Sequence, residues 1–358
     1  MFDGCSSLEA VDVSKIRMDY VNDAEHMFSR CSALKSLDLS NWNLKALHNA
    51  TSIFEDCSSI TDFDLSSFAD TDVQFFNACF KNCSSLEEID LSTFYTAKAT
   101  AYTEMFAGCK SLEFLDLRNF DTAKAVTMQK MFQGCESIVR IDLSSFDTAL
   151  VTDMSYMFRN CYALPELDVS TFKTTAVKTM TYMFAGCRSL EKLDLQTFAT
   201  PKVTTMAFMF MDCNNLKTID ISSFKTTNVT TMQGMFLNDN SLEEIDLSSF
   251  STGKLKYTSQ MFSECHALKT IYVTAKFVVA KVGANDSSSM FYRCNSLIGG
   301  NGTSYSHSHQ TKEYARIDTD STPGYFTNIN QKQLNTLTLF GTGGSVLGKD
   351  MVTVTTEE

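Results

Sequence analysis

The sequence predicts an α/β repeat solenoid, shaped as a horseshoe, with a parallel sheet on its concave face and short helices on its convex face. Three observations support this prediction: a strict 26-residue period, one group of apolar residues at helical spacing in each period, and one group at strand spacing. The clearest copy of the unit is VTDMSYMFRNCYALPELDVSTFKTTA, residues 151–176. A repeat array grows by adding units to one core, so the 358 residues need not form two globular domains.

The dipeptide Met-Phe marks the register of the repeat. It begins at Met1, Met27, Met105, Met131, Met157, Met183, Met209, Met235 and Met261, with Ile53 and Cys79 in the two remaining Met positions. We therefore expect eleven 26-residue units and an irregular twelfth, which together form a solenoid over residues 1–297. The polar, turn-rich segment 298–327 is predicted to cap it, because the last unit would otherwise expose its core. Residues 328–358 are predicted to be a linker or the start of a further module, with LTLFG and MVTVTT as candidate strands.

Each unit begins with a segment of helical periodicity. In the unit at 151–176, the spacing of Val151, Met154, Phe158 and Cys161 places them on one face of a short helix. Thr152 stands where a helix N-cap is expected. The residue before the cysteine is Gly, Asn or Asp in most units, and these residues tolerate the left-handed backbone that often ends a helix.

The second half of each unit has strand periodicity. Leu164, Leu167 and Val169 fit the pattern L-x-x-L-x-L, and the last two alternate with polar residues. This alternation predicts a short strand with one buried face. Phe172 and Thr174 follow, and their equivalents recur in the turn that leads to the next unit.

Cysteine fills one position per unit in almost every unit. The chain has 12 cysteines; Asp239 stands in this position in one unit, and Cys79 is an additional cysteine in a Met position. A small residue that recurs at a single position indicates a column of buried, reduced thiols. No Cys-x-x-Cys pair has zinc spacing, and His307 and His309 lie in a Ser-rich loop typical of solvated histidines.

The motif MFAGCRSLEKLDLQTFAT, which starts at Met183, resembles the BspA-like leucine-rich-repeat surface proteins. The resemblance covers residues 1–327, although Phe replaces the Asn that usually follows L-x-x-L-x-L. It implies a leucine-rich-repeat fold and a location on the cell surface or outside the cell, since such arrays occur on bacteria and some parasitic protists and are thought to mediate adhesion. Because the first unit begins at Met1 with no signal segment before it, we expect the chain to be a fragment of a longer protein.

The sequence offers no candidate for catalysis. The five histidines share no position with a Ser or Cys nucleophile, and no Gly-rich phosphate loop follows a strand. The 42 acidic residues outnumber the 30 basic ones, which argues against nucleic acid as a partner, and no run of 18 apolar residues predicts a membrane span. We therefore expect a non-enzymatic protein without a cofactor.

Ten consecutive units carry Asp at the outward position between the two strand aliphatics. These residues are Asp12, Asp38, Asp64, Asp90, Asp116, Asp142, Asp168, Asp194, Asp220 and Asp246, and without them the net charge would be −2 in place of −12. Most are followed two residues later by Ser, so one interpretation is that hydroxyl groups hold them as part of the architecture. The alternative is a strip that binds divalent cations. Repulsion between stacked carboxylates would raise their pKa values and favour folding in acid, whereas hydrogen bonds would do the opposite.

The outward position two residues before the Asp does not repeat, which is where a repeat scaffold is free to acquire a binding surface. The predicted ligand-binding residues on the concave face are Phe114, Asp116, Arg118, Arg140, Asp142, Glu166, Asp168, Lys192 and Asp194. Phe114, Arg118 and Arg140 should lie close together as a hot spot; the alternative is ordinary surface variation, with Arg140 paired to a neighbouring Asp. The expected partner is a surface protein of a host or neighbouring cell, a matrix protein or a glycan. The competing hypothesis is a structural stalk that presents a neighbouring domain.

Overall fold

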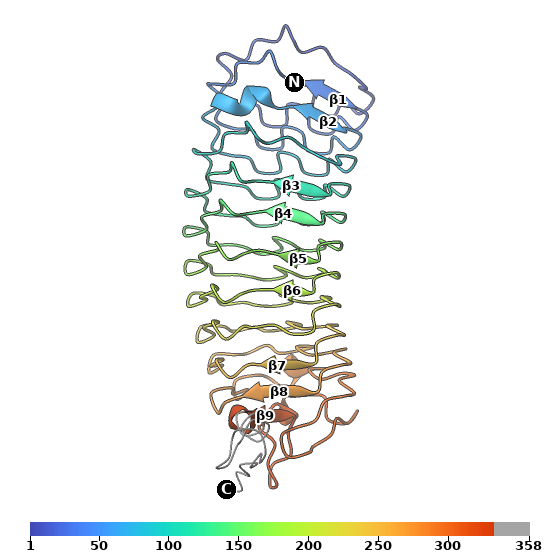
Figure 1. Cartoon of the computed structure of the whole chain (residues 1–358), viewed down its shortest axis with the longest axis vertical. Helices are drawn as coiled ribbons and strands as arrows, with labels where there is room; N and C mark the ends of the chain where they lie inside the picture. Colours follow the sequence, from blue (N-terminus) through green and yellow to red (C-terminus); the bar gives the residue numbers. More distant parts are fainter. Residues whose placement is uncertain (333–358) are drawn as a thin grey trace, which may run out of the picture.

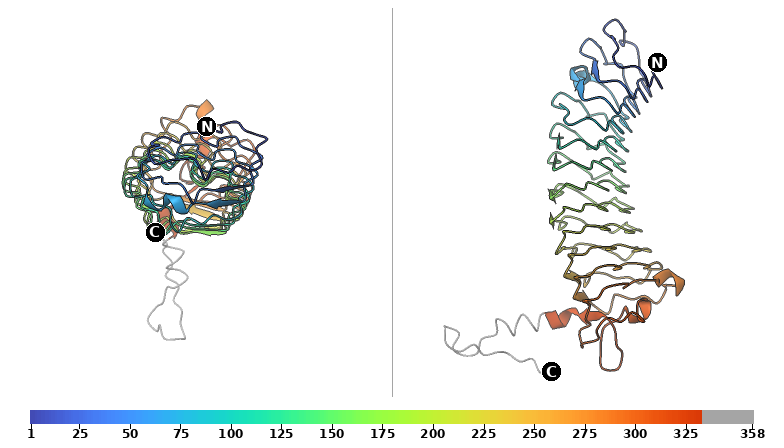
Figure 2. Two further views of the ribbon diagram at one scale, coloured as in Figure 1. Left: turned by 90° about the horizontal axis from the view of Figure 1, so that it is seen from above. Right: turned by 90° about the vertical axis from the view of Figure 1, so that its right-hand side faces the viewer.

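The computed structural model describes residues 1–332 and shows a parallel solenoid, which confirms the predicted fold class. Each 26-residue unit forms one coil, since Ser36 pairs with Asp62, Phe114 with Arg140 and Glu166 with Lys192, each 26 positions further along. The coils stack into one long column (Figure 1), whose N-terminal coils bend away from its axis (Figure 2). Residues 333–358, with the candidate strands LTLFG and MVTVTT, lie outside the described part of the chain.

Short strands in most of the coils form the sheet face, which we define as the side of the column that carries β1–β8. The strands are β1 (Ser36–Asp38), β2 (Asp62–Asp64), β3 (Phe114–Asp116), β4 (Arg140–Asp142), β5 (Glu166–Leu167), β6 (Lys192–Leu193), β7 (Glu244–Asp246), β8 (Thr270–Val273) and β9 (Phe326–Asn328). They pair as β1-β2, β3-β4, β5-β6 and β7-β8-β9, all parallel. In β1–β4 and β7 the middle residue is buried and its two neighbours point outward, as the alternating pattern predicts.

Pro165 explains why the sheet is interrupted between β4 and β5. In most other coils the equivalent residue donates its backbone N–H to the coil before it: Lys35 donates to Glu9 at 3.2 Å and Val139 to Glu113 at 2.9 Å. Proline has no N–H, so the carbonyl oxygen of Val139 lacks this donor. The loss of this bond leaves β4 and β5 adjacent but unpaired.

The predicted short helices differ from what the structure shows. We define the turn segment as residues 152–160 and their equivalents in other coils; it consists of consecutive turns, and residues 1–328 contain only three short 3-10 helices, Ser66–Asp70, Asn285–Ser287 and Lys312–Tyr314. Two residues per turn segment, such as Tyr156 and Asn160, have φ of 62°. A left-handed residue at every fourth position prevents an α-helix from propagating. The sequence predicted the Asn160 position to be left-handed, and this is confirmed.

The turn segments form the most continuous hydrogen-bond ladder in the molecule. Backbone N–H groups of Met154, Tyr156 and Phe158 donate to carbonyl oxygens one coil further on, at 2.9–3.3 Å. Single bridges continue this ladder from Asp23 to Tyr257 without a break. An α-helix is about 10 Å wide, whereas hydrogen-bonded chains lie about 4.8 Å apart. Since both sides of each coil keep the narrow spacing, most coils stack as a nearly straight column (Figure 1), and the curvature is concentrated toward the N-terminal end (Figure 2).

The core between the strands and the turn segments consists of stacked aromatic and aliphatic columns. The Phe of the Met-Phe pair stacks on its equivalent in the next coil, as in Phe158 on Phe184 with ring centroids 5.8 Å apart. Phe63 from β2 reaches across the core to Phe54 of a turn segment, 4.7 Å between centroids. The pattern of apolar residues in the sequence therefore specifies the core as well as the period.

The cysteine column is buried, as predicted, and none of the 12 cysteines is in a disulfide. Its thiols also form hydrogen bonds that the sequence did not reveal. Cys161 Sγ donates to the carbonyl oxygen of Phe132 at 3.3 Å, and Cys187 Sγ donates to that of Phe158 at 3.2 Å. The position therefore requires a residue that is small and can donate a hydrogen bond. Cys5, in the first unit, is the exposed member of the set.

The recurrent threonine joins adjacent coils. Thr148 Oγ1 accepts the backbone N–H of Lys173 at 2.7 Å and donates to the carbonyl oxygen of the same residue at 3.0 Å. The same double contact joins Thr122 to Asp147. These threonines are buried, so the hydroxyl group satisfies two backbone groups that would otherwise be costly to bury.

The segment predicted to cap the array lies against the last coil. Tyr325 and Phe326 are buried against Phe291, with ring centroids 5.1 and 6.0 Å away. β9 continues the sheet beyond β8, pairing Phe326 with Ile271. The carboxylate of Asp318 accepts backbone N–H groups of Asn301, Thr303 and Gly324, which holds the segment in place. The boundaries 1–297, 298–327 and 328–358 remain a proposal.

Candidate binding site on the sheet face

The Asp column of the sheet face has a constant structural contact. In all ten coils, Oδ1 of the Asp accepts the backbone N–H of the residue two positions later, at 2.8–3.1 Å. The contact persists where Arg118 or Gln196 replaces Ser, so the backbone N–H is the common partner. Ser144 adds its hydroxyl group, which donates to Asp142 at 2.7 Å. Each Asp thus closes the turn that follows its strand.

Hydrogen bonding outweighs repulsion along this column. Contacts from Ser170 lower the pKa of Asp168, and contacts from Ser222 do the same for the pKa of Asp220. Neighbouring carboxylates oppose this only weakly: Asp116 raises the pKa of Asp142, but Ser144 lowers it more. This favours the interpretation of the column as architecture. Within residues 1–332 no three or more His, Cys, Asp or Glu side chains are grouped so that they could hold a metal ion.

Arg118 is fully engaged with the Asp column. Its Nε lies 3.0 Å from Asp116 Oδ1 and its Nη2 lies 2.6 Å from Asp116 Oδ2. Its Nε is also 3.8 Å from Asp142 Oδ2. The side-chain hydrogen bonds from Arg118 lower the pKa of Asp116 to about 2. Arg118 therefore neutralises the column at the position where a cation replaces the usual Ser.

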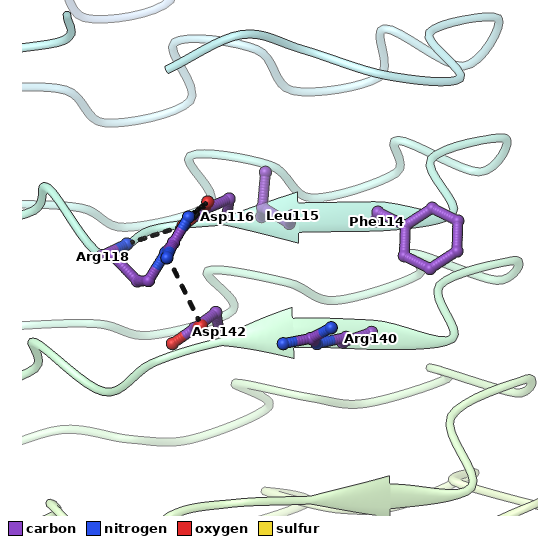
Figure 3. A pocket seen from close by; sticks show the side chains of 6 residues that line it. All are labelled: Phe114, Leu115, Asp116, Arg118, Arg140 and Asp142. Atoms are coloured by element: carbon purple, nitrogen blue, oxygen red, sulfur yellow. Dashed lines mark hydrogen bonds and ion pairs between the residues drawn. The ribbon is translucent and has the colours of Figure 1, made fainter. Parts of the chain in front are cut away.

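Arg140 lies beside Phe114, its partner in the register of β3 and β4. Figure 3 shows the Arg140 side chain on the outer side of β4, between Phe114 and Asp142. Among the described residues it forms no side-chain hydrogen bond or ion pair, so a direct pair with a neighbouring Asp is not observed, although its charge helps to lower the pKa of Asp116. Phe114 is 57% exposed, which is unusual for a phenylalanine in this protein.

Two hollows adjoin at Arg140. The first, of about 210 Å³, is lined by Phe114, Leu115, Asp116, Arg118, Arg140 and Asp142 (Figure 3). The second, of about 320 Å³, lies at the interruption between β4 and β5 and is lined by residues 139–144 together with Pro165, Glu166 and Asp168. Of the predicted site residues, seven line these hollows. Lys192, which starts β6, and Asp194 lie further along the sheet face and line neither hollow.

Val139 and Pro165 line the second hollow but were missing from the predicted site. Both precede a strand, in a position that the sequence analysis did not treat as part of the outward surface. Both side chains are exposed on the sheet face. An apolar pair at a position that is otherwise mostly Glu, Lys or Thr was the signal that could have identified them.

The stacked parallel coils, the buried L-x-x-L-x-L positions and the outward variable residues define a leucine-rich-repeat scaffold. The family model described as "Mycoplasma protein of unknown function, DUF285" matches residues 1–114, 100–215 and 187–301, and the chain belongs to this family. This match and the 26-residue solenoid confirm the resemblance to BspA-like leucine-rich-repeat proteins. A search of curated protein sequences finds no match.

A search of solved structures matches two bacterial leucine-rich-repeat proteins. A leucine-rich repeat protein from Bacteroides ovatus is 18% identical, with 77% of this chain and 80% of that chain covered and a TM-score of 0.35. A leucine-rich cell surface protein from Faecalibacterium prausnitzii is also 18% identical, with 72% and 78% covered and a TM-score of 0.34. Among the described residues, no helix combines the length and apolar character needed to cross a membrane.

Proposed function

We propose that the protein is a non-enzymatic, adhesin-like binding module that recognises a protein or glycan through its sheet face. The observation that carries the proposal is the pair of hollows around Arg140. Here an unpaired guanidinium group adjoins an exposed phenylalanine, on a face whose other outward Arg is held by carboxylates. Exposed aromatic and Arg side chains in a concave setting are the usual anchors of protein interfaces.

The partner would be a surface protein of a host or neighbouring cell, a matrix protein or a glycan. A location on the cell surface or outside the cell follows from the sequence resemblance to BspA-like proteins and belongs to the same proposal. Catalysis is not part of this proposal: Ser144, which lines the second hollow, donates to Asp142 within the turn contact that recurs in the other coils.

A binding screen tests the proposal. The intact chain is presented to arrays of matrix proteins, cell-surface proteins and glycans, and each ligand found is retested against the Arg140→Gln variant. Arg188→Gln is the matched control, since Arg188 is also exposed but stacks on Tyr162 at 4.5 Å, outside both hollows. We expect at least one ligand whose binding Arg140→Gln weakens and Arg188→Gln does not. Ligands that respond equally to both variants would contradict the proposal.

A structural stalk is the second candidate function. The unbroken ladder of turn segments from Asp23 to Tyr257 favours it, because a column joined coil to coil along its length suits a rigid spacer. A stalk needs no specific ligand. If the screen finds none, and ligands are found for a neighbouring domain in the full-length protein, the stalk is favoured.

A further inference from the structure

The charges that line the first hollow, two Asp and two Arg, balance each other. Asp116 and Asp142 are both within reach of Arg118, at 2.6 and 3.8 Å. Arg118 and Arg140 together balance these two carboxylates, and Arg140, whose charge also lowers the pKa of Asp116, does so without a direct ion pair. The chain as a whole carries a net charge of −12, and the neighbouring coils present Asp without a cation in the column. An anionic group can approach the sheet face here with less repulsion than elsewhere along the column.

The second hollow contains an unpaired backbone acceptor. The carbonyl oxygen of Val139 has no hydrogen-bond donor among the described residues, because its structural neighbour Pro165 has no N–H. By contrast, the carbonyl oxygen of Glu113 one coil earlier accepts from Val139, and that of Pro165 one coil later accepts from Glu191 at 2.9 Å. Val139 lines the second hollow, so a ligand in that hollow can bring an N–H group to this unpaired carbonyl oxygen.

Apolar side chains complete the surface on both sides of Arg140. Phe114 lies on one side, and Val139 and Pro165 lie at the second hollow. Phe114 and Val139 are among the large apolar residues of this protein that remain exposed. They require a ligand that carries apolar groups near its anion.

We propose that the ligand group recognised at this site is an extended polypeptide segment that carries an Asp or Glu next to an apolar residue. Its carboxylate binds the Arg140 guanidinium, a backbone N–H binds the Val139 carbonyl oxygen, and its apolar side chain covers Phe114 or Pro165. A polypeptide supplies these three groups at neighbouring positions of one chain, whereas an unsubstituted glycan has no aliphatic side chain to cover Val139 and Pro165. This inference rests on the proposed function and specifies the ligand of that site.

Selection from a displayed library of random peptides tests the inference, because such a library samples acidic, basic and apolar sequences alike. The intact chain, the Arg140→Gln variant and the Arg188→Gln control are each used as bait. We expect the intact chain and the control to enrich peptides in which Asp or Glu adjoins an apolar residue, and Arg140→Gln to lose this enrichment. For a synthetic peptide from the enriched pool, Arg140→Gln should weaken binding by about tenfold or more, because a charged hydrogen-bonded pair is lost. Equal melting temperatures of the three proteins exclude a folding defect.

The variant Pro165→Ala tests the role of the carbonyl group independently of Arg140. It supplies the missing N–H to the ladder, so the Val139 carbonyl oxygen becomes paired, and binding of the same peptide should weaken severalfold. Enrichment without acidic residues, enrichment unchanged in Arg140→Gln, or no enrichment at all would overturn the inference. The inference would also be overturned if the binding screen found a protein or glycan whose binding does not depend on Arg140. In that case the protein would still be a binding module, but Arg140 would not be its anchor. Binding only to acidic glycans, lost in Arg140→Gln, would overturn the polypeptide assignment alone.

Discussion

Asp239 is the exception in the cysteine column, and its environment allows a quantitative prediction. Its side chain is 1% exposed. Oδ1 accepts the backbone N–H of Cys213 at 2.9 Å, but Oδ2 has no partner among the described residues. Desolvation raises the pKa of this carboxyl group well above its ordinary value, and the nearby Asp212 carboxylate raises it further. The fold therefore favours the neutral form of Asp239 over the carboxylate.

Asp239→Cys restores the residue that the other coils use. The new thiol can donate to the carbonyl oxygen of Phe210, as Cys213 Sγ donates to that of Phe184 at 3.3 Å. The backbone N–H of Cys213 loses its acceptor Oδ1 but still donates to the carbonyl oxygen of Phe210 at 3.1 Å, so the substitution leaves no buried N–H without an acceptor. Removal of a buried, unsatisfied polar atom should raise the free energy of unfolding by about 1–3 kcal/mol.

The gain from Asp239→Cys should increase with pH. A carboxyl group whose folded-state pKa is raised contributes most below its unfolded pKa of about 3.9 and loses that contribution as pH rises through the folded pKa. Urea unfolding followed by circular dichroism at about pH 5 and about pH 7.5 measures the difference. The reciprocal variant Cys187→Asp, which introduces a carboxyl group at a fully buried position, should destabilise. A variant no more stable than the parent, or a gain that is the same at both pH values, would refute the reasoning.

Three further predictions concern the coils. Hydrogen bonds lower the pKa values of most of the Asp column, so the column's contribution to folding stability is present above the unfolded pKa of about 3.9 and is lost as pH falls. The melting temperature should therefore be lower at about pH 2.5 than at about pH 4.5, and calcium should not change it. A higher melting temperature at the lower pH would contradict this prediction. Thr148→Val removes both hydrogen bonds to the backbone of Lys173 and should lower the free energy of unfolding, measured by urea titration, by about 1–3 kcal/mol. Thr148→Ser keeps the hydroxyl group and should retain most of the parent's stability. Gly134→Ala, at φ 74° and with no atom closer than 3.7 Å to the added Cβ, should cost about 1–2 kcal/mol. Gly108→Ala should cost more, because its Cβ would lie 2.1 Å from Asn82 Oδ1, and equal losses in the same titration would show that this contact is unimportant.

The period, the core and the parallel strands could be predicted because the residue types at the repeating positions each fit only one structural environment. Leu164, Leu167 and Val169 alternate as a half-buried strand must, and Asn160 belongs to the few residue types that accept a left-handed backbone. Tyr156 gave no such signal, although its φ is also 62°. Aromatic residues rarely adopt this conformation, so the second left-handed position remained invisible and a helix was predicted where the chain forms turns.

The candidate site was predicted in part. Its location could be inferred because Phe114 and Arg140 break the repeat on an outward position. The sequence could not show which of the two Arg side chains is available to a ligand. This depends on the side-chain geometry, which places Arg118 against Asp116 and leaves Arg140 without a direct ion pair. The unpaired carbonyl of Val139 follows from Pro165, but only once the register between the coils is known.

The central claim is that the sheet face, and not the turn segments, binds a ligand. It is tested most directly by covering one side at a time with a bulky label. In a Cys5→Ser background, which removes the exposed thiol, Ser144→Cys places a maleimide-polyethylene glycol on the sheet face and Lys178→Cys places it on a turn segment. The claim predicts that the label at position 144 abolishes binding to ligands found in the screen, while the label at position 178 leaves it unchanged. Loss of binding from the turn-segment label alone, or equal loss from both, would contradict it.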